Sequence, residues 1–241
     1  MNSALGSTRT VPAQVACGNC NLARICIPSG MNAREVAALS DTVRRNRTLR
    51  RGDAIYHAGD HFNGIFALKS GTAKLVHVDR AGNESIISVM LPGELLGFDG
   101  LASGRYVCSV VALETSSYCE LPSQQLPRLS QYIPAIHSIL LQRTGQRFEE
   151  SIRRLASIQR PADQRLAGFL LDLSARYHAL GFSATEFRVS LTRQEIGDHL
   201  GLALETVSRL LGQFEALGLI VVQGKLIRIV NSQALRGYSP H

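Results

Sequence analysis

The sequence contains no apolar run long enough to cross a membrane. A membrane-spanning helix needs about 18 or more consecutive apolar residues, and this chain of 241 residues has no such run although it is 45% hydrophobic. Residues 1–16 are small and polar, and they lack the apolar stretch of a secretory signal. We therefore expect a cytoplasmic protein without a membrane partner.

Cysteine is too scarce to suggest a disulfide scaffold. The chain has five cysteines, and without a secretory signal we expect a reducing compartment, where disulfides are rare. Three of them, Cys17, Cys20 and Cys26, fall within ten residues in a C-x2-C-x5-C pattern. A segment this short cannot form a core of its own, so we predict that its thiolates hold a metal or a cluster. A fourth ligand is then needed, and Cys108 and Cys119 are both candidates.

Length and charge set broad limits on function. A chain of this length can form two domains, each with its own core. The formal net charge is +7 and the isoelectric point is near 9.5. This excess of positive charge is compatible with a polyanionic partner, although charge alone is weak support for nucleic-acid binding.

Residues 49–120 have the pattern of a small β-structure. Short apolar runs at 65–68, 73–78 and 85–90 are separated by turns that contain glycine. Regularly spaced strands with such turns are typical of a barrel or roll. Residues 79–83 are expected to form the tip of a hairpin between two of these strands.

Residues 134–159 are predicted to form one long helix, because Gly145 is the only glycine within this range and the next proline is Pro161. The apolar pattern allows two faces. One face contains Phe148, Ile152, Leu155 and Ile158. The other begins with Ile136 and Leu140 and continues through Arg143, Arg147 and Glu150. The helix either packs on its own roll or forms a subunit seam with a polar, weakly stable middle, and the register stays open.

The last 80 residues or so contain the pattern of a winged helix-turn-helix. Thr192 and Glu195 form a capping box that opens a helix, and Gly201 lies at the tight turn. The second helix packs inward through an apolar face and leaves polar residues outside. The inward residues are Val207, Leu210 and Leu211, and the outer ones are Glu205, Ser208 and Arg209. Residues 219–222 and 226–230 form a two-stranded wing.

The outer face of the second helix has the chemistry of DNA recognition. Arg209 can bind guanine through two hydrogen bonds, Glu205 can accept from cytosine N4, and Ser208 is a short polar contact. The alternative is a surface ion pair between Glu205 and Arg209, which are four residues apart. Ala203, at the expected start of this helix, lacks the oxygen of a capping side chain, a deficit of about 1 kcal/mol.

The order of these parts resembles the CRP/FNR superfamily of bacterial transcription regulators, and within it the oxygen-sensing FNR group. The resemblance rests on the cysteine triad and on residues 93–99, 113–122 and 202–211. It implies an α+β chain: a double-stranded β-roll like a cyclic-nucleotide-binding jelly roll, a long dimerisation helix and a C-terminal winged helix-turn-helix. The corresponding segments are 1–30 (cluster binding), 31–125 (roll), 126–160 (dimerisation helix) and 161–241 (DNA binding).

The resemblance implies a [4Fe–4S] cluster on Cys17, Cys20, Cys26 and Cys119, since the fourth cysteine of the family precedes an acidic-apolar-proline motif. Cys108 is then a buried strand residue. The implied activity is oxygen-responsive transcription control. The loaded chain forms a homodimer on TTGAT-like inverted repeats of double-stranded DNA, and oxygen destroys the cluster and weakens DNA binding.

The same resemblance assigns two protein contacts. The dimer contact involves Arg143, Arg147 and Glu150, and the apolar pattern of the helix adds Ile136 and Leu140 to it. The hairpin tip contacts RNA polymerase through Asp79, Gly82, Asn83 and Glu84, and the alternative for this tip is a solvated turn.

Three other functions are alternatives to this one. Cyclic-nucleotide binders of the superfamily carry a Gly-Glu pair and an Arg-Ser or Arg-Thr pair, whereas this chain has Phe98 after Gly97 and Val107 before Cys108, so we expect no cyclic nucleotide. A structural zinc site or another ligand would make the chain a differently controlled CRP-type regulator. An enzyme is not expected, because Ser190, Asp198 and His199 are explained by capping and packing.

Overall fold

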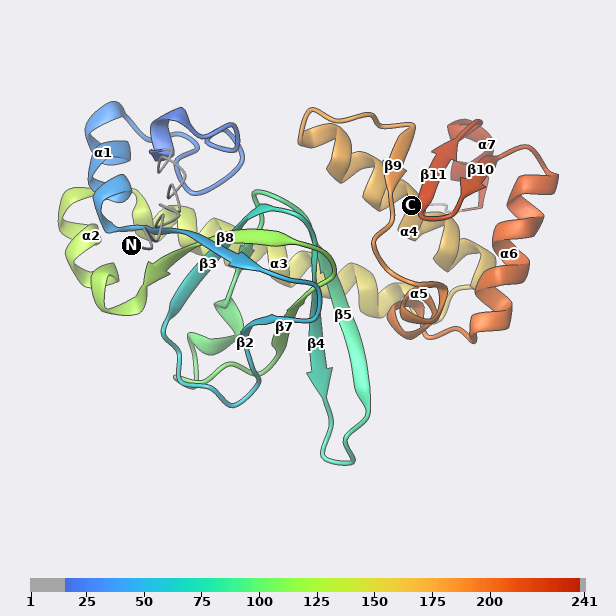
Figure 1. Ribbon diagram of the computed structural model, residues 1–241, viewed down its shortest axis with the longest axis horizontal. Coiled ribbons are helices and arrows are strands. Elements are labelled where there is room, and N and C mark those ends of the chain that lie inside the picture. Colours follow the sequence, from blue (N-terminus) through green and yellow to red (C-terminus); the bar gives the residue numbers. More distant parts are fainter. Residues whose placement is uncertain (1–15, 239–241) are drawn as a thin grey trace, which may run out of the picture.

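Glycine-containing turns and short apolar strands fold the central part of the chain into an antiparallel β-roll (Figure 1). The computed structural model describes residues 16–238, so residues 1–15 of the expected cluster-binding segment and 239–241 lie outside it. One sheet has the order β1-β8-β3-β6, formed by Arg44–Leu49, Ser116–Pro122, Gly64–Ser70 and Leu95–Leu96. The other has the order β2-β7-β4-β5, formed by Ala54–Tyr56, Ser109–Ala112, Ala73–Val78 and Glu84–Met90.

Successive side chains along β3 and β8 point to opposite faces of the first sheet, and both faces are covered by apolar side chains. Phe66, Leu68 and Tyr118 point into the core of the roll, whereas Ala67 belongs to a second hydrophobic cluster on the outer face. Cys119 pairs with Ala67 and packs against that outer cluster. The outer cluster also receives side chains from α1 (Ala33–Thr42), α2 (Leu126–Tyr132) and the N-terminal loop that contains the 3-10 helix η1 (Cys17–Asn19). The side chain of Cys119 is therefore covered by the N-terminal part of the chain.

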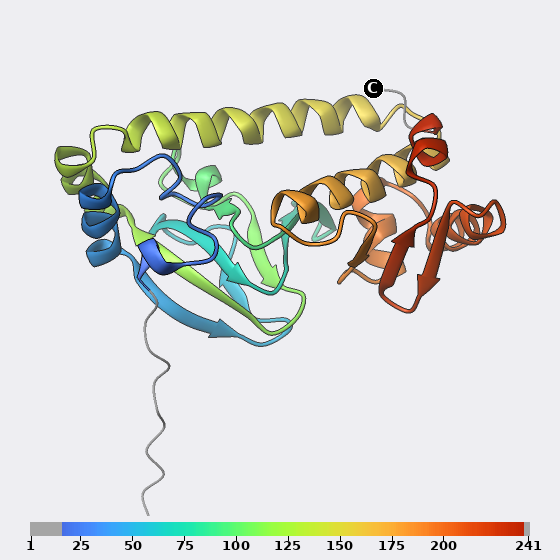
Figure 2. The same cartoon turned by 90° about the horizontal axis from the view of Figure 1, so that it is seen from above.

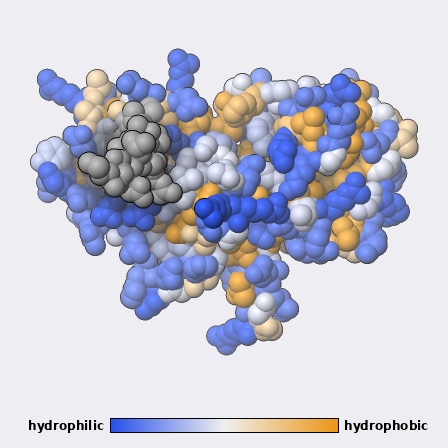
Figure 3. Space-filling view, in the orientation of Figure 1, coloured by the Kyte–Doolittle hydropathy of each residue, from blue (hydrophilic) through white to orange (hydrophobic). Residues whose placement is uncertain are grey.

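The expected hairpin lies between β4 and β5 and projects from the body of the roll (Figure 3). The Asp79 carboxylate accepts hydrogen bonds from the backbone N–H groups of Ala81 and Asn83, at 2.8 and 2.9 Å. Gly82 has a φ of +87°, which favours glycine. These contacts hold the tip in one conformation and leave its side chains exposed.

A long helix, α3 (Ile136–Ser157), follows the roll and runs beside both the roll and the C-terminal domain (Figure 2). It lies within the expected range of 134–159. The short helix α2 precedes it, so two helices occupy the segment 126–160 that was expected to be a dimerisation helix. Among the described helices, none is long and apolar enough to cross a membrane.

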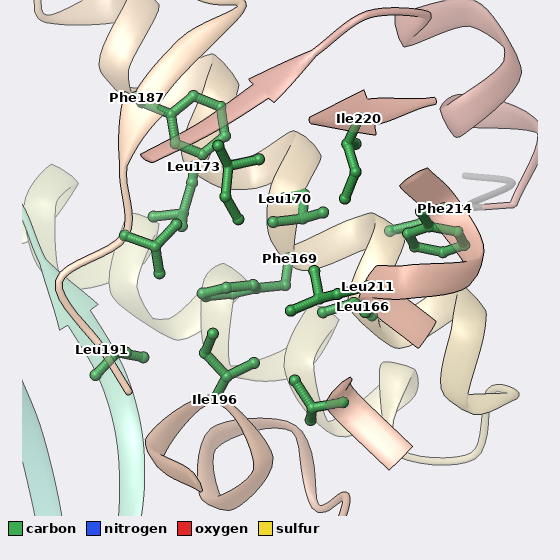
Figure 4. Close-up of a cluster of buried hydrophobic side chains, with 14 of the residues drawn as sticks. Leu166, Phe169, Leu170, Leu173, Phe187, Leu191, Ile196, Leu211, Phe214 and Ile220 are labelled. Atoms are coloured by element: carbon green, nitrogen blue, oxygen red, sulfur yellow. The ribbon is translucent and has the colours of Figure 1, made fainter. Parts of the chain in front are cut away.

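The C-terminal part folds as a winged helix-turn-helix, as expected. Its core contains side chains from four helices and the small sheet β10-β11-β9, part of which is drawn in Figure 4. The elements in chain order are α4 (Ala162–Ala179), β9 (Glu186–Arg188), α5 (Arg193–Leu200), α6 (Leu204–Ala216), β10 (Ile220–Gln223), β11 (Leu226–Ile229) and α7 (Ser232–Gly237).

The roll and the DNA-binding domain share one apolar core and several polar contacts. Ile86 and Val89 of β5 belong to the same hydrophobic cluster as α4 and α5. Lys74 Nζ lies 2.9 Å from Glu195 Oε1, and both side chains are less than a fifth exposed. Burial, followed by the nearby Arg154 charge, lowers the pKa of His199 to about 4. Its neutral ring donates from Nδ1 to the Ile86 carbonyl at 3.1 Å. The first helix of the helix-turn-helix is thus fixed against the roll.

Candidate metal centre and nucleic-acid interface

Turns of the N-terminal loop bring its three cysteines over the outer face of the first sheet. The backbone N–H of Cys20 donates to the Cys17 carbonyl at 3.3 Å, and that of Cys26 donates to Leu22 at 2.9 Å. Leu22 and Ile27 are buried and anchor the loop. The backbone N–H of Cys17 donates to Ser40 Oγ of α1 at 3.2 Å. The loop therefore has its own contacts with the rest of the protein.

All four expected ligand residues line one pocket. Cys17, Cys20 and Cys26 reach it from the loop, and Cys119 reaches it from β8. The other lining side chains are apolar: Ala23, Ile27, Pro28, Leu39, Val43, Ile65, Ala67 and Leu121. Burial raises the pKa of the Cys26 thiol to about 12, and charge on Cys119, Cys17 or Cys20 would raise it further. The pocket thus places four thiols within electrostatic reach of one another, in surroundings that disfavour free thiolates.

Cys108 lies elsewhere in the roll. It is buried just before β7, and its backbone N–H donates to Asp99 Oδ2 at 2.9 Å. Burial, and then the Asp99 charge, raise the pKa of its thiol to about 11. It does not line the four-cysteine pocket. Of the two candidates for a fourth ligand, Cys119 is the one that meets the N-terminal cysteines.

The four thiols are not gathered tightly around one point. Within residues 16–238, no three His, Cys, Asp or Glu side chains are close enough to hold a single metal ion. In a [4Fe–4S] cluster each thiolate binds a different iron, so the sulfurs stand farther apart than the ligands of one tetrahedral zinc. Four thiols that line one pocket are the donor set that such a cluster uses.

The local signals of the helix-turn-helix form as expected. The Thr192 hydroxyl accepts from the Glu195 backbone N–H at 3.1 Å, and the Glu195 carboxylate accepts from that of Thr192 at 2.8 Å. Gly201 ends α5 with a φ of +64°. A side chain at Gly197 would come within 2.5 Å of the Leu202 carbonyl, so glycine is needed for the turn to pack closely. Ala203 precedes α6 without a side-chain cap.

Helix α6 presents a polar face to solvent. Glu205 and Arg209 are exposed and Ser208 is partly buried, whereas Val207 and Leu210 point into the core. The alternative ion pair between Glu205 and Arg209 is not among the ion pairs of the described residues. Both side chains are therefore available to a partner in the major groove.

Helix α3 has an inner and an outer face, and this corrects part of the expected dimer contact. Ile136 is 1% exposed, fills the core of its own chain and cannot form a subunit contact. Leu140 packs on the same cluster. Arg143 donates to the Ile25 carbonyl at 2.9 Å, and Arg147 donates to the Leu95 carbonyl at 3.3 Å. Their contacts place these four residues on the side of the helix that faces the roll, which is the inner face.

Glu150 is exposed and pairs with Arg147 at 2.8 Å. The outer face carries exposed apolar side chains that no part of the described chain covers: Leu141, Phe148, Ile152 and Leu155. Sequence reasoning found three of these residues but missed Leu141, although Leu141, Phe148 and Leu155 follow one another at intervals of seven.

Two family models match the chain in the order of its domains. Residues 46–132 match the cyclic nucleotide-binding domain, and residues 164–238 match the Crp-like helix-turn-helix domain. The transcriptional activator FnrA of Stutzerimonas stutzeri is 38% identical over 223 residues, which cover 92% of this chain and 91% of FnrA. The fumarate and nitrate reduction regulatory protein of Salmonella typhimurium is 36% identical over 228 residues, 94% and 91% of the two chains. The chain belongs to the CRP/FNR family of transcription regulators.

Solved structures of CRP/FNR proteins share the fold. FixK2 of Bradyrhizobium japonicum superposes with a TM-score of 0.74 at 24% identity, over 81% of this chain and 97% of FixK2. The regulator CLP of Xanthomonas campestris has a TM-score of 0.66 at 19% identity, over 82% and 99%. At these identities the likeness concerns the fold alone.

As a CRP/FNR regulator the protein is a transcription factor and not an enzyme. The side chains weighed as catalytic have separate structural partners. Ser190 donates to Glu114 at 3.1 Å, Asp198 accepts from Gln194 at 2.8 Å, and His199 contacts the Ile86 carbonyl.

Replacement of Arg209 tests base recognition by α6. We expect Arg209→Ala to lower discrimination at one base pair of each half-site by about 1–3 kcal/mol, because a two-bond contact with guanine is lost. Arg209→Lys is the matched control: it keeps the charge but not the planar fork, and should also lose discrimination. Binding to a series of single-base operator variants measures the effect. An equal loss on every operator would show that Arg209 contacts phosphate only.

Proposed function

We propose that this CRP/FNR protein is an anaerobic transcription regulator that holds a [4Fe–4S] cluster on Cys17, Cys20, Cys26 and Cys119. The observation that carries the proposal is the pocket in which thiols from the N-terminal loop and from β8 meet. Relatives of this chain are named as anaerobic regulators, among them the anaerobic regulatory protein of Haemophilus influenzae, which is 39% identical over 218 residues. The loaded protein would bind TTGAT-like inverted repeats as a homodimer.

The chemistry of the pocket supports a cluster. Free thiolates are disfavoured there, because the walls are apolar and the thiols lie near one another. An iron–sulfur core supplies the positive charge that makes four thiolates stable at one site. The apolar walls would also restrict access of solvent, which tunes the stability of such clusters.

The cluster, when bound, would join the N-terminal loop to β8 through bonds that oxygen can break. Without those bonds the loop depends on weaker contacts: the buried side chains of Leu22 and Ile27, and the hydrogen bond from Cys17 to Ser40. The loop also contacts α3, since Arg143 donates to the Ile25 carbonyl. Loss of the bonds between the cluster and the loop would therefore disturb the inner face of α3.

The outer face of α3 would form the subunit seam. Leu141, Gly145, Phe148, Ile152 and Leu155 follow the alternating spacing of four and three residues that two-stranded helix packing requires. A dimer matters to DNA binding because two recognition helices must lie about 34 Å apart, one turn of DNA. Gly145 contributes no side chain to the middle of the seam, so a modest disturbance of α3 would shift the monomer–dimer equilibrium.

The roll is filled by its own side chains, which supports control without a cyclic nucleotide. Tyr56 and Tyr106 stack with their ring centroids 3.8 Å apart, and Phe66 packs beside them. The Asp99 carboxylate accepts the backbone N–H groups of Val107 and Cys108, both at 2.9 Å. A cyclic phosphate at these amides would meet the negative charge of Asp99, and the nearby Arg105 guanidinium contacts the Gly59 carbonyl and His61 instead.

The β4–β5 hairpin is the proposed contact for RNA polymerase, through Asp79, Gly82, Asn83 and Glu84. Its support is structural: the tip projects from the roll, is exposed, and is held in one conformation by Asp79.

Two cysteine variants test the ligand set. Cys119→Ala should abolish cluster assembly and anaerobic DNA binding, because β8 supplies no other thiol to the pocket. Cys108→Ala is the matched control and should retain both, since Cys108 lies elsewhere in the roll. Iron and sulfide content and an operator-binding assay under anaerobic conditions measure the difference. Equal losses in the two variants would mean that the ligand set is wrong.

A substitution on α3 tests the proposed seam. Phe148→Ala should weaken dimerisation of the loaded protein by about 2 kcal/mol or more, because an apolar contact is lost from both subunits. Arg153→Ala, at an exposed position of the same helix outside the apolar stripe, should change little. Sedimentation equilibrium measures the effect. Unchanged dimerisation of a loaded Phe148→Ala protein would place the seam elsewhere.

A further inference from the structure

The loop between β5 and β6, residues 91–94, contacts three parts of the chain that are far from it in sequence. The N-terminal loop meets it at Gly93, α3 meets it through Arg147, and α4 of the DNA-binding domain meets it through Arg176. Residues from all three parts, with Glu94 among them, line one cavity at this junction. The side chain of Glu94 connects two of the three.

Arg176 forms a two-bond ion pair with Glu94. Its Nε and Nη2 atoms donate to the two carboxylate oxygens, each at 2.9 Å, and Nη2 also donates to the Val89 carbonyl. Only 23% and 22% of the two side chains are exposed. Paired geometry of this kind is strong and directional. Removal of either partner leaves the charge of the other largely buried and only partly compensated, by Arg147 for Glu94 and by Asp172 for Arg176, which is costly.

The same carboxylate reaches α3. Glu94 Oε2 accepts from Arg147 Nη2 at 3.4 Å and from the Leu91 backbone N–H at 3.1 Å. Arg147 Nη2 also donates to the Leu95 carbonyl at 3.3 Å. One acidic side chain of the roll therefore holds the inner face of α3 and the first helix of the DNA-binding domain together.

The N-terminal loop presses on the residue before Glu94. Gly93 has a φ of +87°, and a methyl group placed on it would lie 2.7 Å from Ile25 Cδ1. The carbonyl of Ile25 accepts from Arg143 of α3 at 2.9 Å. Ile25 directly precedes Cys26, so displacement of the cysteine loop removes a contact from the backbone that positions Glu94.

We infer that Glu94 is a positioning residue through which the state of the cysteine pocket reaches the DNA-binding domain within one subunit. This inference rests on the proposed function. When the loop leaves Gly93, the 91–94 loop loses its support and the Glu94–Arg176 pair is weakened. Helix α4, and α6 with it, then loses its fixed orientation against the roll. This route is separate from the outer seam of α3 and acts in each subunit.

A double-mutant cycle on the full-length protein tests the route. Operator affinity is measured for wild type, Glu94→Gln, Arg176→Gln and the double variant, before and after exposure to air. We expect each single variant to lower the affinity of the anaerobic dimer about tenfold, and the double variant to lose no more than the larger single loss. The air-exposed protein should change little, so the ratio of the two affinities shrinks. Iron content should match wild type in all variants, and dimerisation should match wild type in Arg176→Gln, because Arg176 contacts the roll and Asp172 but not α3.

Asp172→Asn is the matched control. Asp172 also pairs with Arg176, at 3.1 Å, but it lies on α4 itself and is 60% exposed. Its loss should change operator affinity on the order of twofold or less. Additive losses in the cycle would overturn the inference. So would equal losses before and after air, which a merely structural role produces, or losses fully explained by weaker dimerisation.

Failure of the proposed function is distinguishable from failure of the junction. A protein without iron and sulfide would contradict the cluster, but the junction is also tested by hydrogen exchange on the anaerobically purified chain, whatever its metal content. There Glu94→Gln should raise amide exchange in α4 and β5, and Asp172→Asn should not. Unchanged exchange in α4 of the Glu94→Gln variant would overturn the role of Glu94 as a positioning residue.

Discussion

The antiparallel pairing of β8 between β1 and β3 is the constraint on which the functional parts of this protein depend. Alternation along β8 sends Tyr118 into the roll and Cys119 to the opposite face, where the N-terminal loop covers it. The same strand ends at Pro122 and leads into α2 and α3. A shift of one residue in this register would bury Cys119 inside the roll and leave the loop cysteines without a partner.

Helix α3 has two faces with different roles in this arrangement. Its inner face contacts the cysteine loop through Arg143 and the 91–94 loop through Arg147, and its outer face bears the apolar stripe around Phe148. Under the proposed function, a change in the pocket would reach DNA by two routes: through the association of subunits and through the docking of α4 at Glu94. The two routes act on the same recognition helix, since dimer spacing and domain orientation both decide where α6 meets the groove.

Local signals in the sequence predicted the parts that depend on neighbouring residues. The capping box at Thr192 and the left-handed turn at Gly201 formed as expected, because their partners lie within a few residues. The face of α3 that meets the roll could not be derived in this way, since Ile136 and Phe148 are both apolar and only long-range packing separates them. The Glu94–Arg176 pair joins residues 82 positions apart, and no sequence spacing indicates it.

Metal and acid-labile sulfide content, measured with an absorption spectrum on anaerobically purified protein before and after air, tests the central claim most directly. The proposed function predicts about four iron and four sulfide per chain, with a spectrum that bleaches in air as dimer becomes monomer. One zinc per chain that air does not change would contradict it. That result would leave a DNA-binding CRP/FNR regulator whose four-cysteine pocket is structural and senses no oxygen.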